Sequence, residues 1–139
     1  MQNLEKTIGS LIDRLNVSIM GSVDEDGFPN VKALLKPRKR EGIKTFWFPT
    51  NTSSVHVAQF RVEPRSCLYF FDRRTHKGVM LRGKMEVIED GETKKMIWNE
   101  GDVRYYNKGV NDPDYCVLKF TTLSGRYYVE FSSRNFTVS

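Results

Sequence analysis

The sequence predicts a mainly β protein with short α-helices, folded as a single barrel or sandwich. Nine Phe, six Tyr and two Trp give an aromatic content that favours strands. Six or seven strand-like runs are separated by turn residues and a few short helical stretches. The length of 139 residues fits one domain, which we expect to span residues 1–139. No repeat, linker or low-complexity tract divides the chain.

The first half of the chain begins with apolar residues at helical spacing, which predict an amphipathic helix over residues 2–16. A β-type run over Val17–Val23 follows and ends in turn residues from Asp24 to Pro29. The next predicted elements are, in order, a strand over Asn30–Arg38, a strand over Ile43–Phe48, a short helix over Val55–Phe60 that ends before Pro64, and a strand over Ser66–Asp72.

The second half predicts a polar turn, a long strand, a helix, a loop and a final hairpin. We expect Gly83 to mark a bend or bulge in the long strand. The hairpin is expected to turn at Ser124–Gly125. The corresponding ranges are Arg73–Gly78 for the turn, Val79–Glu89 for the long strand, Gly91–Trp98 for the helix, Gly101–Asp114 for the loop, and Tyr115–Thr122 with Arg126–Phe131 for the hairpin.

The net charge of +5 indicates attraction to an anionic partner, either nucleic acid or a phosphorylated small molecule. No recognition-helix, zinc-finger or RNP-type pattern accompanies the basic residues, which argues against nucleic acid. A solvated basic face is the plain alternative. No apolar run is long enough for a membrane span, and the charged N-terminal helix is unlike a signal peptide, so we expect a cytoplasmic protein with no membrane partner.

Histidine and cysteine usage argues against a metal site, because His56, His76, Cys67 and Cys116 form no ligand cluster. We expect the two cysteines to be buried free thiols, with a disulfide as the alternative. No GxSxG elbow indicates a serine nucleophile, although a triad assembled in space stays open.

Lysines and serines between residues 30 and 56 suggest a phosphate site. The strand over Asn30–Arg38 alternates, with Lys32, Leu34 and Lys36 on one face. Ser53 and Ser54 precede the predicted helix, whose N-terminal N–H groups and partial positive charge suit a phosphate. A plain N-cap is the alternative role for these serines.

An ordered set of short motifs resembles the pyridoxamine 5'-phosphate oxidase-like FMN-binding split-barrel family, in its general-stress-protein branch. The resemblance covers roughly residues 4–131. The motifs are Gly27-Phe28-Pro29, Ala33-Leu34-Leu35-Lys36, Phe46-Trp47-Phe48, Thr50-Asn51, Ser54-Val55-His56, Ala58-Gln59, Glu63-Pro64, Leu68-Tyr69-Phe70, the run Val79–Glu86 with Gly83 inside it, and the trailing Trp98, Tyr105-Tyr106, Gly109 and Asp112–Tyr115.

The resemblance implies a six-stranded antiparallel split barrel that forms a homodimer, with FMN in grooves between the protomers. It implies cofactor-binding roles for a set of residues around one strand, one loop and one helix start. It assigns Lys36 to the phosphate, Thr50 to the contact where strand meets loop, and Ser54 to the serine at the helix start. The full set of expected FMN-binding residues is Val31, Lys32, Ala33, Leu34, Lys36, Thr50, Ser53, Ser54 and His56.

The chain departs from the family pattern at two of these positions, Val31 and His56, and at the neighbouring Val55. Val31 replaces an arginine at the strand start, Val55 replaces an arginine before the helix, and His56 replaces a lysine at the helix start. Gly78 stands where the oxidase has a flavin-contacting glutamine. A histidine carries charge at a phosphate only if the phosphate raises its pKa. Trp98, Tyr105 and Tyr106 suit either stacking on a flavin or core packing.

The resemblance implies a flavin-dependent oxidoreductase of unidentified substrate. The alternative is a flavin-binding module without turnover, of the stress-protein kind. The flavin performs the redox chemistry in such proteins, so we name no catalytic residue. The end of the chain, Gly125–Phe131, lacks the arginine and histidine that the oxidase uses for the vitamin phosphate, so we do not expect that specific activity.

Overall fold

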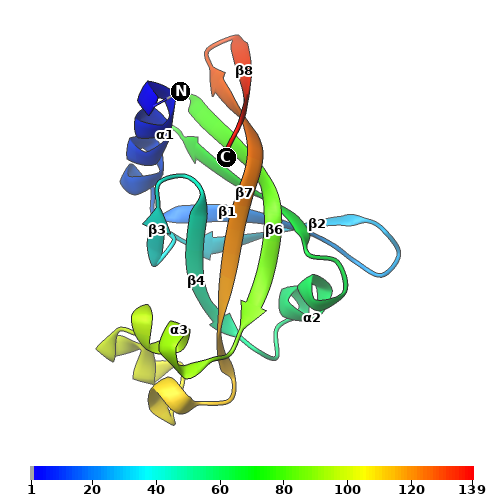
Figure 1. Ribbon diagram of the computed structural model, residues 1–139, viewed down its shortest axis with the longest axis vertical. Helices are drawn as coiled ribbons and strands as arrows, with labels where there is room; N and C mark the ends of the chain where they lie inside the picture. The colour runs from blue at the N-terminus through cyan, green and yellow to red at the C-terminus, as the bar shows by residue number, and fades with distance from the viewer. Residues whose placement is uncertain (1) are drawn as a thin grey trace.

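The computed structural model describes residues 2–139, and its strands form one open, antiparallel sheet of eight strands (Figure 1). The fold class predicted from the sequence is confirmed: the protein is mainly β, and its unclosed sheet is that of a split barrel, although it has eight strands where six were expected. The elements are α1 (Gln2–Arg14), β1 (Val17–Val23), β2 (Pro29–Leu35), β3 (Lys39–Glu41), β4 (Thr45–Asn51), α2 (Val55–Val62), β5 (Arg65–Asp72), β6 (Lys77–Ile88), α3 (Gly91–Met96), two 3₁₀ turns (Glu100–Arg104 and Gly109–Asn111), β7 (Tyr115–Val129) and β8 (Ser132–Thr137).

The strand order is β2-β1-β5-β6-β7-β4-β3, with β8 added beside β7. β1 and β2 run across the direction of β4, β7 and β6 (Figure 1), so the sheet bends over a common core. Because the sheet does not close, β2 lies at one end of the strand order and the β4–β3 hairpin at the other. These two ends frame the candidate site.

The main core lies between the sheet and α1. The spacing that predicted α1 is explained by burial, since Leu4, Ile8, Leu11 and Ile12 all pack inward. Phe46, Phe70 and Phe120 meet in the middle of the core, with ring centroids 6.2 and 6.3 Å from Phe46. A smaller second core joins the β6–β7 connection to the sheet; it comprises Trp47, Ile97, Tyr106, Tyr115 and Val117.

The bulge expected at Gly83 is present, since the β6–β7 register shifts between Arg82 and Gly83. A Cβ atom at Gly83 would overlap the backbone carbonyl oxygen of Thr121. Glycine is therefore required by the close approach of β7.

The predicted hairpin at Ser124–Gly125 is wrong. β7 runs without a break from Tyr115 to Val129, and the chain turns at Glu130 and Phe131, where Glu130 has a φ of 54°. Gly125 lies inside the strand. A glycine is needed there because a Cβ would meet Phe136 and the carbonyl oxygen of Met80. The turn leads into β8, a strand that the sequence analysis did not predict.

Smaller differences occur around β2 and α3. The strand expected over Asn30–Arg38 ends at Leu35, because Pro37 separates it from the short β3. The helix expected over Gly91–Trp98 ends at Met96. The stretch from Gly101 to Asp114 contains the two 3₁₀ turns, in line with the expected loop or short helix.

Candidate functional site

A groove of about 550 Å³ lies between the two ends of the open sheet, and we call it the β2–β4 groove. The first wall is β2 with the residues that follow it, the second is the end of β4, and the third comes from the β6–β7 connection. Its lining residues are Lys32 to Arg38, Phe48 to Asn51, Asn99 and Tyr106. The volume is in the range of small-molecule sites.

The groove is basic: Lys32, Lys36 and Arg38 line it, and none of its lining residues is Asp or Glu. The ion pairs found within residues 2–139 do not include Lys32 or Lys36. Lys36 Nζ donates to the backbone oxygen of Asp13 at 3.1 Å, near the end of α1. The pKa of the Asp13 carboxyl is lowered mainly by Arg40 and in part by the charge of Lys36, so Lys36 lies near this carboxylate without pairing with it and keeps ammonium hydrogens for an anion in the groove.

Arg38, by contrast, is neutralised. Its guanidinium donates to Asp102 at 2.9 and 3.3 Å and to the backbone oxygen of Ile97 at 2.7 Å. Arg38 and the backbone N–H of Asn99 lower the pKa of the Asp102 carboxyl in spite of burial. This ion pair attaches the β6–β7 connection to the groove, where Asn99 and Tyr106 form its wall.

Tyr106 belongs to the second core and also lines the groove. Its ring centroid lies 5.0 Å from that of Tyr115 and 6.2 Å from that of Trp98, so Tyr106 and Trp98 pack in the core, as the alternative expected. Tyr105, by contrast, is 69% exposed. The Tyr106 hydroxyl donates to Asn51 Oδ1 at 3.4 Å. Burial raises its pKa to about 12, so at neutral pH the phenol is a hydrogen-bond donor.

His56 is buried behind Thr50, in the first turn of α2. Its Nε2 atom lies 2.8 Å from Thr50 Oγ1 and 3.1 Å from Ser54 Oγ. Burial, helped by the charge of Lys32, lowers the pKa of His56 to about 4. His56 is therefore a neutral imidazole that contacts the groove through Thr50.

Ser53 and Ser54 face a different cavity, of about 480 Å³, lined partly by Asp24, Glu25 and Glu63. The Ser53 backbone N–H donates to Asp114 Oδ1 at 2.9 Å, so a carboxylate already occupies the position expected for a phosphate. Ser54 takes the N-cap position of α2, but its hydroxyl donates to the backbone oxygen of Asn51 at 2.6 Å. Ser54 is thus the N-cap residue, as the alternative expected, but its side chain does not accept the usual hydrogen bond from the first turn of α2.

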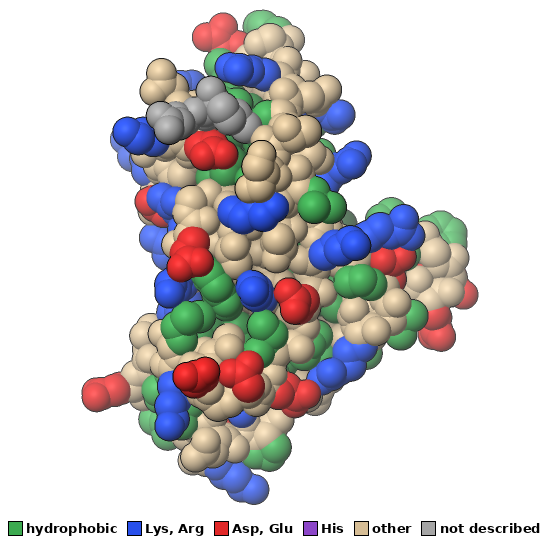
Figure 2. Space-filling model, in the orientation of Figure 1, with side chains coloured by type: hydrophobic (Ala, Val, Ile, Leu, Met, Phe, Trp, Pro, Cys, Tyr) green, Lys and Arg blue, Asp and Glu red, His purple; other side chains and the backbone are tan. Residues whose placement is uncertain are grey.

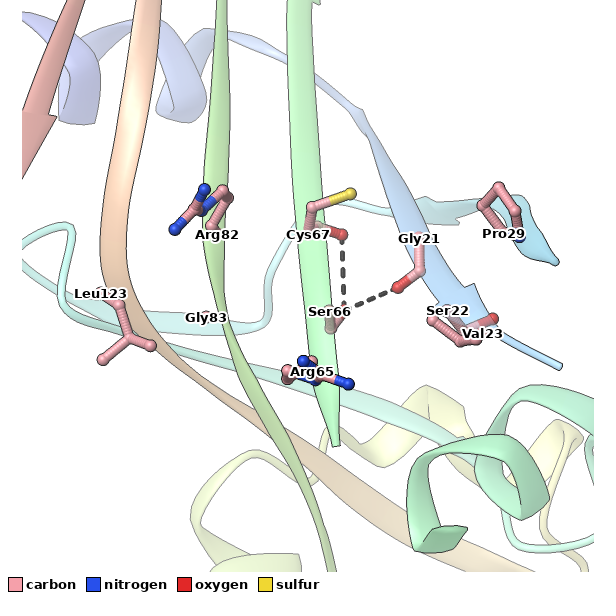
Figure 3. Close-up of a pocket in the computed structure, with 10 residues that line it drawn as sticks. All are labelled: Gly21, Ser22, Val23, Pro29, Arg65, Ser66, Cys67, Arg82, Gly83 and Leu123. Atoms are coloured by element: carbon pink, nitrogen blue, oxygen red, sulfur yellow. Dashed lines mark hydrogen bonds between the residues drawn. The ribbon is translucent and has the colours of Figure 1, made fainter. Parts of the chain in front are cut away.

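A third cavity, of about 470 Å³, lies on the outer face of the sheet (Figure 3). Arg65 and Arg82 border it, and the Cys67 side chain points along its wall. Ser66 Oγ donates to the backbone oxygen of Gly21 at 2.7 Å, and Arg65 pairs with Glu63, which lowers the pKa of that carboxyl to about 2. Arg65 and Ser66 thus have partners within the protein, whereas Arg82 takes part in none of the ion pairs found within residues 2–139.

The expectation for the cysteines is met in part. Both cysteines are free; Cys116 is buried, as expected, whereas Cys67 is only half-buried. Within residues 2–139, no group of three or more His, Cys, Asp or Glu is placed to hold a metal ion, and no helix is long and apolar enough to cross a bilayer. Basic and acidic side chains are interspersed on the face shown in Figure 2, without a continuous field of one sign.

The structure divides the expected site residues into four groups. Lys32, Ala33, Leu34, Lys36 and Thr50 line the β2–β4 groove. His56 lies behind Thr50. Ser53 and Ser54 line the 480 Å³ cavity that contains Asp24, Glu25 and Glu63, and Val31 is 72% exposed outside the groove. Whether these residues bind FMN stays a prediction.

Arg38, Asn51 and Asn99 line the groove but were not predicted to do so. Tyr106 was expected only to stack on a flavin or to pack in the core. Arg38 and Asn99 are 61 positions apart and meet only through the tertiary structure. The local signal was the group of aromatic residues around Trp98 and Tyr106, which suggested either stacking on a ligand or packing in a core. Tyr106 lies in both the groove wall and the second core.

Comparison with known proteins places these observations in a family. The model of the pyridoxamine 5'-phosphate oxidase family matches residues 4–128. A curated relative, the pyridoxine/pyridoxamine 5'-phosphate oxidase of Allorhizobium ampelinum, is 32% identical over 90 residues. That match covers 64% of this chain and 42% of the relative, so the chain matches less than half the length of the oxidase.

Solved structures give the same relationship. A Clostridium acetobutylicum protein related to general stress protein 26, of the pyridoxinephosphate oxidase family, has a TM-score of 0.89 and 34% identity over 99% of this chain and 96% of its own. Two distant structures share the fold alone. An FMN-binding, pyridoxamine 5'-phosphate oxidase-related protein of Nostoc punctiforme has a TM-score of 0.76 and 13% identity, covering 94% and 87%. A heme-binding protein of Mycobacterium smegmatis has a TM-score of 0.73 and 15% identity, covering 91% and 55%.

Proposed function

Since the chain belongs to the pyridoxamine 5'-phosphate oxidase family, we propose that it binds FMN in the β2–β4 groove and is a flavin-dependent oxidoreductase. One observation carries the proposal: the groove is lined by two lysines without carboxylate partners and by no acidic residue. A phosphate is the group that such a surface recognises, because a charge-assisted hydrogen bond to an ammonium is about twice as strong as a neutral one.

The donor set of the groove fits both parts of FMN. Lys32, Lys36 and the Thr50 hydroxyl suit the phosphate. Leu34 and Leu35 supply apolar surface for a ring system, and the backbone of β2 offers hydrogen bonds along the ring edge. The 550 Å³ volume and the mixture of apolar wall and few polar groups are typical of a cofactor site.

When bound, FMN supplies the redox chemistry, and the protein supplies position, dipoles and exclusion of water. Tyr106, with its pKa raised to about 12, can donate a hydrogen bond to the ligand and does not remove a proton at neutral pH. His56 is neutral and buried, so it holds Thr50 in place. The proposed activity therefore requires no acid or base from these two side chains.

The visible spectrum of freshly purified protein tests the cofactor, followed by mass spectrometry of the molecule released on denaturation. FMN is the expected result, with FMN binding more tightly than riboflavin in a calorimetric titration. A heme spectrum, as in the distant M. smegmatis neighbour, would replace the proposal with heme binding. Equal affinity for FMN and riboflavin would show that the phosphate is not recognised.

Lys36→Ala is expected to weaken FMN binding by about 1.5–3 kcal/mol, the usual contribution of a hydrogen bond to a charged group. Riboflavin affinity should not change, because the substitution removes only a phosphate contact. Lys95→Ala is the matched control, since Lys95 is an exposed lysine of α3 outside the groove. Unchanged FMN affinity in Lys36→Ala would place the phosphate elsewhere.

We further propose that the protein is a homodimer that binds one FMN per chain. β2 is a terminal strand of the sheet, and it exposes Val31 and Leu35 by 72% and 78%. Such an apolar edge favours association with another chain, and a two-fold axis would give two equivalent flavin sites.

Light scattering at micromolar concentration tests the dimer and should give about twice the chain mass of 16.2 kDa. Leu35→Lys should shift the protein to monomer, whereas Phe131→Ser, at the fully exposed turn before β8, should not. A monomeric wild-type protein that still binds FMN tightly would support a self-contained pocket instead.

Turnover separates the oxidoreductase from a flavin-binding module. The assay is oxidation of reduced nicotinamide by the FMN-loaded protein, compared with free FMN at equal concentration. A rate well above that of free FMN supports an enzyme. No excess rate with this and other common donors would favour the module.

A further inference from the structure

The hydrogen bonds around His56 fix which of its nitrogens carries the proton. Ser54 Oγ has a single hydrogen, and it donates that hydrogen to the backbone oxygen of Asn51 at 2.6 Å. At its 3.1 Å contact with His56 Nε2, Ser54 must therefore accept. Nε2 must carry the hydrogen, because two lone pairs would otherwise face each other.

The same hydrogen decides the role of Thr50. The single Nε2–H is shared between Ser54 Oγ at 3.1 Å and Thr50 Oγ1 at 2.8 Å, so Thr50 Oγ1 accepts and its own hydroxyl hydrogen is not used by His56. Thr50 is only 6% exposed, and it lines the β2–β4 groove together with Lys32 and Lys36. Its free hydroxyl hydrogen is thus available to an acceptor in the groove.

We propose that His56 is a positioning residue: as a neutral Nε2–H imidazole it holds Thr50 Oγ1 as an acceptor, so that the Thr50 hydroxyl donates to the phosphate of a flavin nucleotide in the groove. The inference rests on the proposed function for the identity of the ligand. It gives His56 a role that differs from a charged phosphate ligand, because the imidazole is separated from the groove by Thr50.

The surroundings of His56 support a fixed, uncharged ring. The imidazole packs edge-on against Phe60 at 6.4 Å, and it is 5% exposed. Lys32 of β2 is the charged group that acts on it, and this positive charge disfavours the imidazolium. In this arrangement Lys32 and Lys36 supply the positive charge that pairs with the phosphate, and His56 fixes the orientation of the Thr50 hydroxyl.

The tautomer is measured directly by long-range ¹H–¹⁵N NMR of the ¹⁵N-labelled protein without flavin. The chain has only two histidines, so His76→Gln assigns the signals. We expect His56 to show a protonated Nε2 and an unprotonated Nδ1 from pH 6 to pH 8. A protonated Nδ1 with a bare Nε2 would overturn the inference, because Thr50 would then donate to His56.

A double-mutant cycle measures the coupling to the ligand. Thr50→Val should weaken FMN binding by roughly tenfold or more, as expected for the loss of a charge-assisted hydrogen bond, and should leave riboflavin binding unchanged. Thr50→Ser, which keeps the hydroxyl, should stay within about threefold of wild type. His56→Leu should weaken FMN binding in the wild-type background but cause no further loss in Thr50→Val.

Rescue distinguishes positioning from simple support of the fold. His56→Gln retains an N–H donor near the Nε2 position and should recover most of the affinity that His56→Leu loses. Additive losses in the double mutant, or equal losses of FMN and riboflavin, would overturn the inference. If wild-type protein binds no FMN at all, the proposed function fails, and the NMR result still decides the geometry of His56 and Thr50 on its own.

Discussion

Acid is expected to destabilise the folded protein through His56. Its pKa falls from the ordinary 6.5 to about 4 because the ring is buried and Lys32 is near. At pH values between these two, the unfolded chain binds a proton that the folded chain does not, so the free energy of unfolding rises with pH. The stabilisation is fully present above pH 6.5 and is lost as the pH falls toward 4.

The size of the effect follows from the shift. A pKa difference of about 2.5 units corresponds to roughly 3 kcal/mol at full development, since each unit is about 1.4 kcal/mol. Between pH 8 and pH 5 the same shift gives about 2 kcal/mol. Lys32→Ala should reduce this difference in the free energy of unfolding, because it removes the positive charge that, together with burial, lowers the pKa of His56.

Urea unfolding followed by tryptophan fluorescence at pH 8 and pH 5 measures this difference. The His56→Gln variant should lose about 2 kcal/mol less than wild type over this range, because it has no proton to bind at position 56. His76→Gln is the control for the other histidine, which is exposed in the β5–β6 turn. The reasoning is refuted if His56→Gln and wild type lose the same free energy.

Two further substitutions test the fold. Gly83→Ala should destabilise the protein by about 3 kcal/mol, because its Cβ would overlap the Thr121 carbonyl oxygen, whereas Gly91→Ala at the start of α3 meets no atom within 4 Å and should change stability little; thermal unfolding measures both. Asp102→Asn should cost roughly 2 kcal/mol in chemical unfolding, because it leaves the Arg38 guanidinium without its charged partner, whereas Glu89→Gln, in an exposed pair, should cost less than about 1 kcal/mol.

Periodicity in the sequence predicted most of the elements, because burial imposes it directly. The helical spacing of α1 and the run of β1 match the observed bounds closely. The failure at Gly125 has a specific cause: a glycine in an apolar run indicates either a turn or a close approach, and only the position of Phe136 decides between them. Glu130, which makes the actual turn, carries no turn signal of its own.

The candidate site was predicted in part for a similar reason. Lys32 on β2 and Lys36 just after it were predicted from the alternation along one segment, and Thr50 on β4 from the family resemblance; the bend of the open sheet brings these positions to one groove. Ser53 was expected to bind an anion, but the carboxylate of Asp114, 61 residues away, already accepts its N–H. A contact of that sequence separation leaves no trace in local spacing.

The attachment of the β6–β7 connection has a consequence for how the protein can change. This connection contributes Asn99 and Tyr106 to the groove, and it is joined to the barrel by the Arg38–Asp102 ion pair, a small aromatic cluster and the hydrogen bonds of Asp114 to Asn51 and Ser53. Ligand preference and stability therefore share this stretch of the chain: replacing the Asn99 side chain changes the groove wall, whereas replacing Asp102, Tyr106 or Asp114 also removes a contact that holds the connection to the sheet.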